Sequence, residues 1–184
     1  MGEERISAAR PEPRKQVYAI GLGSNRRHGR LGAPKCVLVA ATAALVEAGA
    51  DIRAMSPVFT TAPVGPSRRA YANAAALIAV DLDPPGLLAL LKRIERQFGR
   101  RRGQRWSART LDLDILLWSG GTWHSRRPWL TIPHAALRER RFVLDPLTLV
   151  AQNWRVPGGP SVSQLHARLT RPRPAHRSRP RSGP

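Results

Sequence analysis

The sequence predicts an α+β fold, a ferredoxin-like sandwich in which two main helices pack on one antiparallel-rich sheet. Short runs rich in β-forming residues alternate with two longer runs that carry apolar residues at helical spacing, in the order β-α-β, β-α-β. Two such units in succession are typical of the split βαβ arrangement. The 184 residues, 42% of them apolar, suffice for one compact domain with tails.

The first β-α-β unit is predicted over residues 17–61. VYAIGL (17–22) is a short β-rich run, and DIRAMSPVFTT (51–61) indicates a second strand. Between them, CVLVAATAALVEAG (36–49) has helical spacing and ends in Gly49, a residue type common just after a helix. The glycine-rich stretch from Gly21 to Asn25 is predicted to form a tight turn after the first strand.

The second unit starts with YANAAALIAVDL (71–82), which we assign to a strand from its context, although its alanines favour a helix. PPGLLALLKRIERQFG (84–99) is an amphipathic helix with proline at its start and glycine at its end. TLDLDILLW (110–118) is predicted as a strand that the following SGG turns. WLTIPHAALRERRFVLDPLTLVA (129–151) indicates a loop, a helical turn and a second short helix.

The ends of the chain differ in composition from the middle. Residues 1–15 are expected to form a flexible extension, residues 16–169 a single domain, and residues 170–184 a disordered tail rich in arginine and proline. No apolar run reaches the length of a membrane span, and no secretory signal is recognisable. One cysteine excludes an internal disulfide. We therefore expect a cytoplasmic protein, monomeric, with no membrane partner.

The charge is strongly positive: 31 Lys+Arg against 12 Asp+Glu give +19. Such a balance indicates a polyanionic partner, either nucleic acid, a membrane surface or a phosphorylated small molecule. An alternative function is therefore a basic nucleic-acid-binding module on a ferredoxin-like sheet. Against it, only 5% of the residues are aromatic, and no strand carries the aromatic pattern of RNA-binding sheets. Weak contact of the basic tail with nucleic acid stays a secondary expectation.

Two aspartates stand two residues apart in the run RWSARTLDLDILLW (105–118). Because side chains alternate along a strand, Asp112 and Asp114 are predicted on one face, with Leu113 and Ile115 on the other. The two carboxylates repel each other, so a positive partner must lie beside them. Mg²⁺ is a natural partner, since it takes one or two carboxylates and fills its other positions with water and phosphate oxygens. Two such ions could clamp a phosphoryl transfer.

Five arginines precede this pair: Arg100, Arg101, Arg102, Arg105 and Arg109. A lone D-x-D is usually an exposed strand face, and a lone arginine cluster is usually a solvated surface. Next to each other they favour a site for a polyphosphate, because guanidinium groups offer forked donors to phosphate oxygens. A Walker motif is absent, and Arg26 replaces the third glycine of G-x-G-x-x-G, so a dinucleotide site is not indicated.

Aromatic and amide side chains outside this run are weaker candidates. Tyr71 and Asn73 are predicted to share a strand face, where the amide could read the edge of a heterocycle. Trp106 and Phe142 could enclose an aromatic ring, although each alone is more often a packing residue. His134 alone is more often structural, and no set of histidines and cysteines has zinc spacing.

Taken together, these residues resemble the 6-hydroxymethyl-7,8-dihydropterin pyrophosphokinase family of folate biosynthesis. The resemblance extends from about residue 17 to residue 154. The matching segments occur in order: IGLGSN (20–25), TAPVGP (61–66), YANAA (71–75), IERQFGR (94–100), RWSARTLDLDILLW (105–118), LTIPH (130–134) and RRFVLDPL (140–147). The resemblance implies an enzyme that transfers the two terminal phosphates of ATP, as a unit, to the hydroxymethyl oxygen of the pterin and releases AMP.

The resemblance also implies roles for individual residues. Asp112 and Asp114 match the ligands of two Mg²⁺ ions and, with Arg100 and Arg109, the catalytic set. The residues implied at the ATP site are Glu95, Arg100, Arg102, Trp106, Arg109, Ile115, Thr131, His134 and Arg140. The residues implied at the pterin site are Thr61, Val64, Tyr71, Asn73, Trp106, Asp112 and Phe142.

Two departures from the family pattern are visible within the matching region. The segment from Arg102 to Trp106 is one residue shorter than in better-known members. Trp129 occupies a place where the family often has an arginine near the ribose. No general base is evident, and Asp112 could help to polarise the attacking alcohol.

Overall fold

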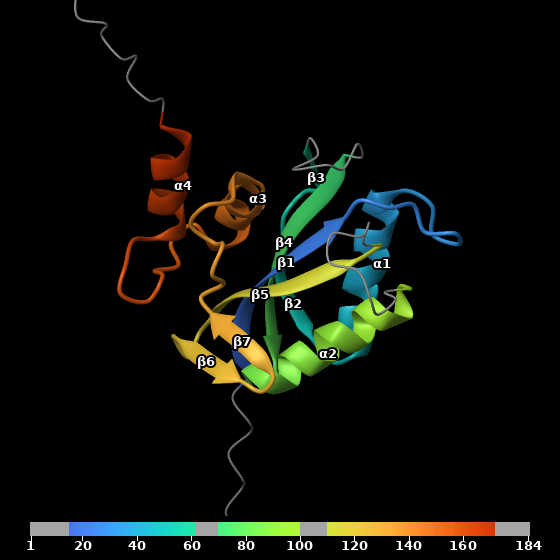
Figure 1. Ribbon diagram of the computed structural model, residues 1–184, viewed down its shortest axis with the longest axis horizontal. Coiled ribbons are helices and arrows are strands. Elements are labelled where there is room, and N and C mark those ends of the chain that lie inside the picture. Colours follow the sequence, from blue (N-terminus) through green and yellow to red (C-terminus); the bar gives the residue numbers. More distant parts are fainter. Residues whose placement is uncertain (1–14, 62–69, 100–109, 172–184) are drawn as a thin grey trace, which may run out of the picture.

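The computed structural model describes residues 15–61, 70–99 and 110–171. The elements along the chain are β1 (Gln16–Ser24), α1 (Pro34–Glu47), β2 (Asp51–Met55), β3 (Phe59–Thr61), β4 (Tyr71–Val80), α2 (Pro84–Gln97), β5 (Asp112–Trp118), β6 (Trp123–Arg126), β7 (Trp129–Ile132), α3 (Arg141–Ala151) and α4 (Val162–Thr170) (Figure 1).

The central sheet has the order β2-β4-β1-β5, with β3 also pairing with β4, and its described pairs are antiparallel. β1 lies in the middle because it pairs with β4 on one side and β5 on the other. The predicted tight turn from Gly21 to Asn25 is wrong, because β1 continues to Ser24 and pairs with both neighbours through Gly23. This order results when two β-α-β units interleave, so the predicted ferredoxin-like α+β fold is confirmed. No helix in the described part of the chain is long and apolar enough to cross a membrane.

The structure divides the predicted strand 51–61 into two. β2 ends at Met55, and β3 starts at Phe59. Ser56 follows β2, and its side chain takes over a hydrogen bond to β4. The Ser56 amide donates to the carbonyl of Ala75, and the Ser56 hydroxyl accepts from the Ala75 amide, each at 2.9 Å. Pro57, which has no amide hydrogen, follows directly. Both pieces remain paired with β4.

The structure also contains a hairpin that the sequence did not predict. β6 and β7 form a separate two-stranded sheet, and β7 falls in a stretch predicted as loop. The hairpin packs through Trp123, whose ring lies edge-on against Trp118 of β5 with centroids 5.8 Å apart. Four-residue strands show too few alternating positions for their period to be recognised.

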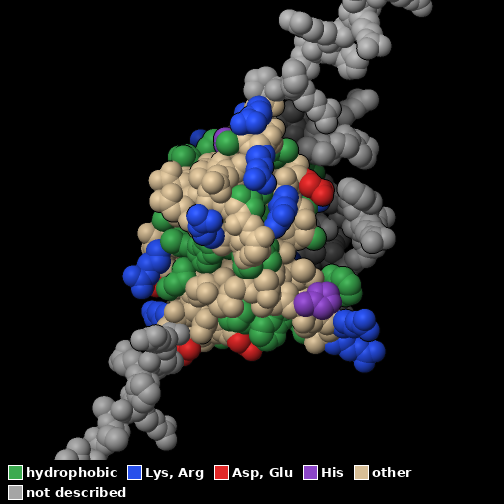
Figure 2. Space-filling model, turned by 90° about the vertical axis from the view of Figure 1, so that its left-hand side faces the viewer, with side chains coloured by type: hydrophobic (Ala, Val, Ile, Leu, Met, Phe, Trp, Pro, Cys, Tyr) green, Lys and Arg blue, Asp and Glu red, His purple; other side chains and the backbone are tan. Residues whose placement is uncertain are grey.

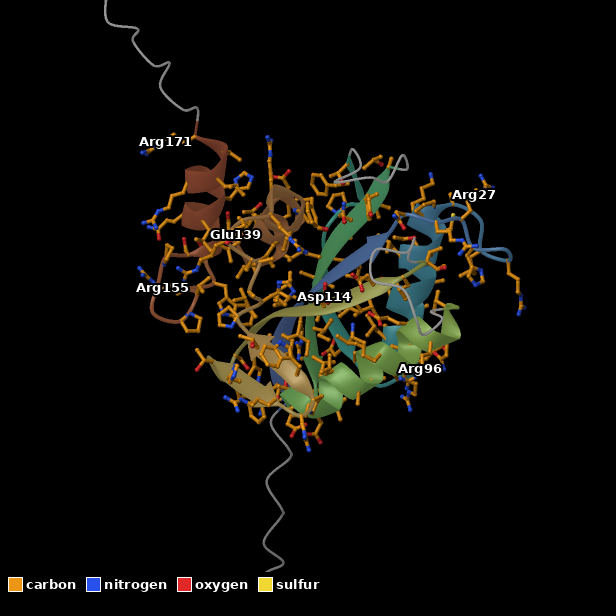
Figure 3. The ribbon with its side chains drawn as sticks, viewed as in Figure 1. Arg27, Arg96, Asp114, Glu139, Arg155 and Arg171 are labelled. Carbon is orange, nitrogen blue, oxygen red and sulfur yellow. The ribbon has the colours of Figure 1, made fainter. Side chains whose placement is uncertain are left out.

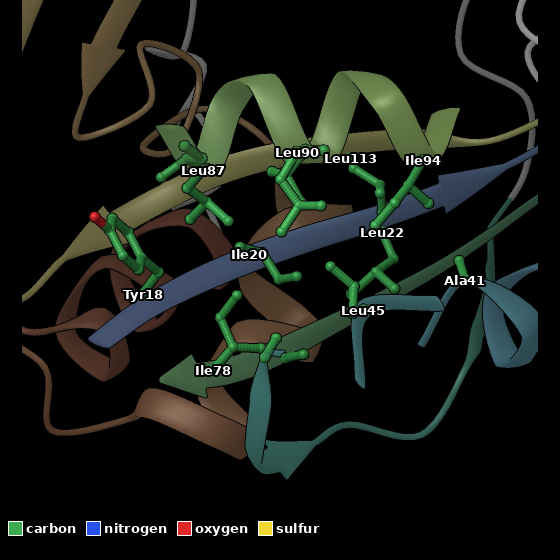
Figure 4. Close-up of a cluster of buried hydrophobic side chains, with 14 of the residues drawn as sticks. Tyr18, Ile20, Leu22, Ala41, Leu45, Ile78, Leu87, Leu90, Ile94 and Leu113 are labelled. Carbon is green, nitrogen blue, oxygen red and sulfur yellow. The ribbon is translucent and has the colours of Figure 1, made fainter. Parts of the chain in front are cut away.

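One face of the central sheet is covered by α1 and α2. Alternate side chains of β1, starting with Tyr18 and Ile20, pack with Leu45 of α1 and with Leu87 and Leu90 of α2 (Figure 4). α2 begins at Pro84, and the residue before it, Asp83, caps the helix. The Asp83 side chain accepts a hydrogen bond from the Gly86 amide at 2.8 Å. This main core holds β5 against α2.

The opposite face is covered at one end by α3 and α4. Ala19, Ala75 and Leu117 of the sheet pack there against Leu144 and Leu147 of α3 in a second core. α4 is joined to this layer by Val162 and Leu165. Figure 1 shows both helices on one side of the sheet, away from α1 and α2. Toward the other end of the same face, the described strands present polar side chains and glycine, and this end is the candidate site.

Candidate active site

Asp112 and Asp114 lie at the start of β5, and both are half-buried. Leu113 and Ile115, which alternate with them, are fully or almost fully buried in the main core. The carboxylates therefore belong to the face opposite α1 and α2, as the alternation predicted. Figure 3 places Asp114 near the centre of the molecule, between the α3–α4 side and the α1–α2 side.

The sheet register brings residues of three strands into one row across this face. Gly23 of β1 pairs with Asn73 of β4 on one side and with Asp112 of β5 on the other. Gly21 pairs in the same way with Ala75 and Asp114. Neighbouring strands are about 4.8 Å apart, so the Cα atoms of Asn73 and Asp112 stand about 10 Å apart, with Gly23 between them. The row joins an amide at one end to a carboxylate at the other.

Asn73 is held in orientation by a neighbouring strand. Its side-chain nitrogen Nδ2 donates a hydrogen bond to Oγ1 of Thr61, on β3, at 2.8 Å. The side chain of Asn73 is buried, while Tyr71 and Thr61 are half-buried. Tyr71 shares the face of Asn73, because the two stand two residues apart on β4. Three of the residues implied at the pterin site thus lie together.

Glu95, on α2, contacts β5 from the side of the main core. It is fully buried on α2, and its Oε1 accepts hydrogen bonds from the Leu113 amide at 2.8 Å and from Lys92 Nζ at 2.7 Å. Lys92 also donates to the Leu113 carbonyl at 3.1 Å. Both groups act on the residue between Asp112 and Asp114. Sequence reasoning assigned Glu95 to the ATP site and missed Lys92, whose only signal was its place three residues before a glutamate on a helix.

The remaining described candidates for the nucleotide site occupy three different places. Ile115 points into the main core, away from the carboxylate face. The amide of His134 donates to the Leu116 carbonyl at 3.0 Å, and its Nδ1 accepts from the Ala136 amide at 3.1 Å, so the ring is fixed beside β5. Thr131 lies on the β6–β7 hairpin, 3.2 Å from Nδ1 of His124.

Two candidates lie where α3 begins. The guanidinium of Arg140 stands 5.7 Å from the ring centroid of Phe142, which is half-buried in the first turn of the helix. α3 also contacts β3 and β4, the strands that carry Thr61 and Asn73. The aromatic ring and the amide therefore belong to adjoining elements.

The donor set of the site fits Mg²⁺. Over residues 15–61, 70–99 and 110–171 no cluster of three or more histidine, cysteine, aspartate or glutamate side chains could enclose a metal. Asp112 and Asp114 are a pair, which is the number of carboxylates that Mg²⁺ takes when water and phosphate oxygens complete its shell.

Comparison with known proteins gives this arrangement its context. The chain matches the family model of 7,8-dihydro-6-hydroxymethylpterin-pyrophosphokinase (HPPK) over residues 19–152. The chain belongs to the HPPK family. A relative from Haemophilus influenzae, named 2-amino-4-hydroxy-6-hydroxymethyldihydropteridine pyrophosphokinase, is 38% identical over 148 residues, which cover 79% of this chain and 88% of the relative. A relative of the same name from Pseudomonas aeruginosa is also 38% identical, over 83% of this chain and 91% of its own length.

A solved structure agrees at the level of the fold. The crystal structure of Plasmodium falciparum HPPK-DHPS, wild type with SDX-DHP, superposes with a TM-score of 0.62 at 12% sequence identity. The match covers 86% of this chain and 45% of that longer chain.

The described part of the chain contains only some of the predicted site. Val64 and the segment with Arg100, Arg102, Trp106 and Arg109 fall outside the described residues, so their assignments stay predictions. Trp129, where the HPPK family often has an arginine, is 73% exposed on β7, with its ring 5.9 Å from that of His124.

Proposed function

We propose that the end of the sheet face with Asp112, Asp114 and Asn73 is the active site of a pyrophosphokinase. The reaction is ATP-dependent transfer of a pyrophosphoryl group to the hydroxymethyl group of 6-hydroxymethyl-7,8-dihydropterin, with release of AMP, in folate biosynthesis. The observation that carries the assignment of the site is the register, which sets a carboxylate and a buried amide at two ends of one row with glycine between them.

We assign the metal to Asp112 and Asp114. Their carboxylates would hold two Mg²⁺ ions. When bound, the metal neutralises phosphate charge and orients the nucleotide. The other catalytic residues in this proposal are Arg100 and Arg109, which would grip the polyphosphate. Arg102, Trp106, Thr131, His134 and Arg140 would complete the nucleotide site.

The pterin would be read by Asn73, whose amide is held by Thr61. An amide offers both a donor and an acceptor, which suits the edge of a pterin ring. Tyr71 and Phe142, with Trp106, would pack against the ring faces, and Val64 would line the same pocket. In this arrangement the hydroxymethyl group points along the row toward Asp112.

The chemistry then needs positioning more than covalent catalysis. The hydroxymethyl oxygen attacks the β-phosphorus of ATP in line, the bond from that phosphorus to the α,β-bridging oxygen breaks, and AMP leaves with the bridging oxygen. The alcohol proton passes to solvent, with Asp112 polarising the alcohol before attack. Charge on the phosphoryl oxygens is neutralised by cations, so orientation and electrostatics dominate the rate.

The test is the identity of the nucleotide product. The full chain is incubated with ATP, Mg²⁺ and 6-hydroxymethyl-7,8-dihydropterin, and the nucleotides are separated by chromatography. We expect AMP in equal amount to the pterin diphosphate, and none without the pterin. ADP would identify a simple kinase, and an intact ATP pool would contradict the proposed activity.

No observation favours the nucleic-acid alternative. The Arg-rich tail lies outside the described residues. On the side of the molecule where α4 lies, basic side chains stand among hydrophobic and polar ones (Figure 2). Arg155, Arg168 and Arg171 are exposed there.

A further inference from the structure

Helix α1 is apolar on both its inner and its outer face. Four buried residues form the inner face in the main core: Val37, Leu38, Ala41 and Leu45. Four exposed residues form the outer face: Cys36, Val39, Ala43 and Val46. Val39 is 67% exposed and Val46 is 52% exposed. A helix that is apolar all round is normally buried on every side, so its composition indicates a partner for the outer face of α1.

α2 shows that the helical layer does not require an apolar outer surface. It covers the same face of the sheet as α1, and its exposed residues in the last two turns are Arg93, Arg96 and Gln97. α1 has no charged residue between Lys35 and Glu47. The difference between two helices of one layer points to a contact that α1 alone makes.

The four exposed residues of α1, which we call the α1 seam, follow one another at intervals of three, four and three residues. This is the spacing of the a and d positions through which two helices pack side by side. It gives a continuous apolar stripe about 15 Å long, since each residue of a helix adds about 1.5 Å.

The α1 seam is complementary to itself when a second copy runs in the opposite direction. Val39 then lies opposite Ala43 of the second copy, so a large side chain meets a small one. The same register sets Cys36 opposite Val46, because both pairs are symmetric about Ala41. Every seam residue has an apolar counterpart, and a twofold axis through this midpoint makes each contact occur twice.

The charges at the two ends of α1 favour the same arrangement. Lys35 precedes the seam and Glu47 follows it, both are exposed, and they too are symmetric about Ala41. In the antiparallel pair, Lys35 of each copy stands beside Glu47 of the other, whereas a parallel pair brings like charges together. We propose that the α1 seam is the interface of a homodimer with twofold symmetry, in which two α1 helices pack antiparallel.

The dimer is weak, and it replaces the expected monomer by a concentration-dependent equilibrium. One 14-residue helix from each copy buries less than the roughly 1,200 Å² of a standard interface, which is the range of transient complexes. Two copies of a chain with charge +19 also repel, until salt screens them over about 8 Å at physiological ionic strength. The dimer should therefore tighten as salt is raised.

Sedimentation velocity of the full chain, from low micromolar to several hundred micromolar, measures the dimer Kd. Wild type is compared with Val39→Lys, which places a charge in the seam, and with Gln97→Lys, which adds the same charge at an exposed position of α2. We expect Val39→Lys to raise the dimer Kd at least about 10-fold, while Gln97→Lys stays within about 2-fold of wild type. Rates of AMP formation and Tm should be equal in all three, because Val39 is exposed and α1 covers the sheet face opposite the site aspartates.

A short thiol–thiol cross-linker tests the direction of the helices. The chain has one cysteine, Cys36, and in the antiparallel pair the two copies of Cys36 stand about 15 Å apart along the helix axis. Val46→Cys places a second thiol opposite Cys36 of the other copy, so this variant should give a covalent dimer. Wild type, and the double variant Cys36→Ser with Val46→Cys, have one thiol per chain and should stay uncross-linked.

Three results would overturn the proposal. A chain that stays monomeric at every concentration shows that the α1 seam faces a different protein or none. A dimer that Val39→Lys leaves intact uses another surface. Wild-type chains that cross-link through Cys36 pack their α1 helices in parallel, against the charge pattern. The proposed pyrophosphokinase activity is tested separately, by AMP formation, and stands or falls independently of the dimer.

Discussion

Glu95 Oε1 lies 2.8 Å from the backbone nitrogen of Leu113 and accepts its hydrogen bond. This contact joins α2 to β5 at the residue between the two site aspartates. The carboxylate is fully buried, and Lys92, three residues earlier on the same helix, balances its charge at 2.7 Å. A buried glutamate is stable only when its charge and lone pairs are satisfied. The pair therefore fixes where β5 presents Asp112 and Asp114.

Glu95→Ala removes this support. It removes the acceptor of the Leu113 amide and the carboxylate that balances the Lys92 charge, and breaking such a pair costs about 3 kcal/mol of unfolding free energy. Turnover should fall as well, because the aspartates lose their fixed position. Chemical denaturation and initial rates of AMP formation measure the two effects.

Glu95→Gln is the matched variant, since its amide oxygen can still accept from Leu113. It should recover most of the turnover lost in Glu95→Ala, while Arg93→Ala, at an exposed position on the same helix, should change neither quantity. Equal turnover in Glu95→Ala and wild type would remove the positioning role.

Thr61→Val tests whether the Thr61 hydroxyl orients the Asn73 side chain. The substitution preserves shape but deletes the hydroxyl that accepts from Asn73 Nδ2. A lost hydrogen bond of about 1.4 kcal/mol corresponds to about a 10-fold rise in the KM for the pterin. The KM for ATP should not change. Thr60→Val, at the neighbouring exposed position of β3, is the control. An equal effect of both valines on the pterin KM would exclude a role of the Thr61 hydroxyl.

Tyr18 links stability to alkaline pH. Its hydroxyl donates to the Leu82 carbonyl at 2.7 Å, and burial, reinforced by the Asp83 carboxylate, raises the pKa of Tyr18 above its ordinary value. The folded state thus favours neutral tyrosine. The stability that results is fully present below pH about 10, the pKa of tyrosine in the unfolded chain. It declines as the pH rises from there toward the pKa of Tyr18 in the folded protein.

Tyr18→Phe should be less stable than wild type by about 1 kcal/mol at pH 8, because the Leu82 carbonyl loses its donor. The difference should shrink above pH 10, since phenylalanine does not ionise. Urea denaturation of both proteins at several pH values checks this. A difference that grows with pH would contradict it.

Ser161 starts α4 through a capping box. Its hydroxyl accepts from the Gln164 amide, and the Gln164 side chain accepts from the Ser161 amide at 2.9 Å. Ser161→Ala should lower the unfolding free energy by about 1 kcal/mol, and Ser161→Asp should keep it. Turnover at a temperature where both variants are folded should equal wild type, because α4 covers the other end of the sheet face. A loss of turnover in folded Ser161→Ala would contradict the conclusion that α4 lies apart from the active site.

The elements that could be predicted have strong local signals. α2 combines helical spacing with Pro84 at its start, and Gly99 follows it in the positive-φ conformation expected of glycine. β4 formed a strand despite its alanines, because burial between β1 and β2 on a packed sheet overrides propensity. β6 and β7 have no comparable signal, since each depends on the other for its hydrogen bonds. Tertiary pairing decides such short strands.

At the site, too, features that depend on tertiary packing could not be predicted from local sequence. Alternation predicted the common face of Asp112 and Asp114 from β5 alone. The contact of Glu95 with Leu113 could not be predicted, because it depends on how α2 packs on the sheet. The row that brings Asn73 and Asp112 to either side of Gly23 depends on the register of two partner strands, which no local pattern records.

The most direct test of the account replaces each site aspartate by its neutral isostere. Initial rates of AMP formation are measured against Mg²⁺ concentration for wild type, Asp112→Asn, Asp114→Asn and Asp51→Asn. The last alters an aspartate on β2 that is half-buried and paired with Arg53. We expect each site variant to keep its Tm, to lose at least about 100-fold in rate and to require more Mg²⁺ for half-maximal activity, while Asp51→Asn matches wild type. Wild-type rate and Mg²⁺ dependence in either site variant would contradict the claim that these carboxylates hold the metal for pyrophosphoryl transfer.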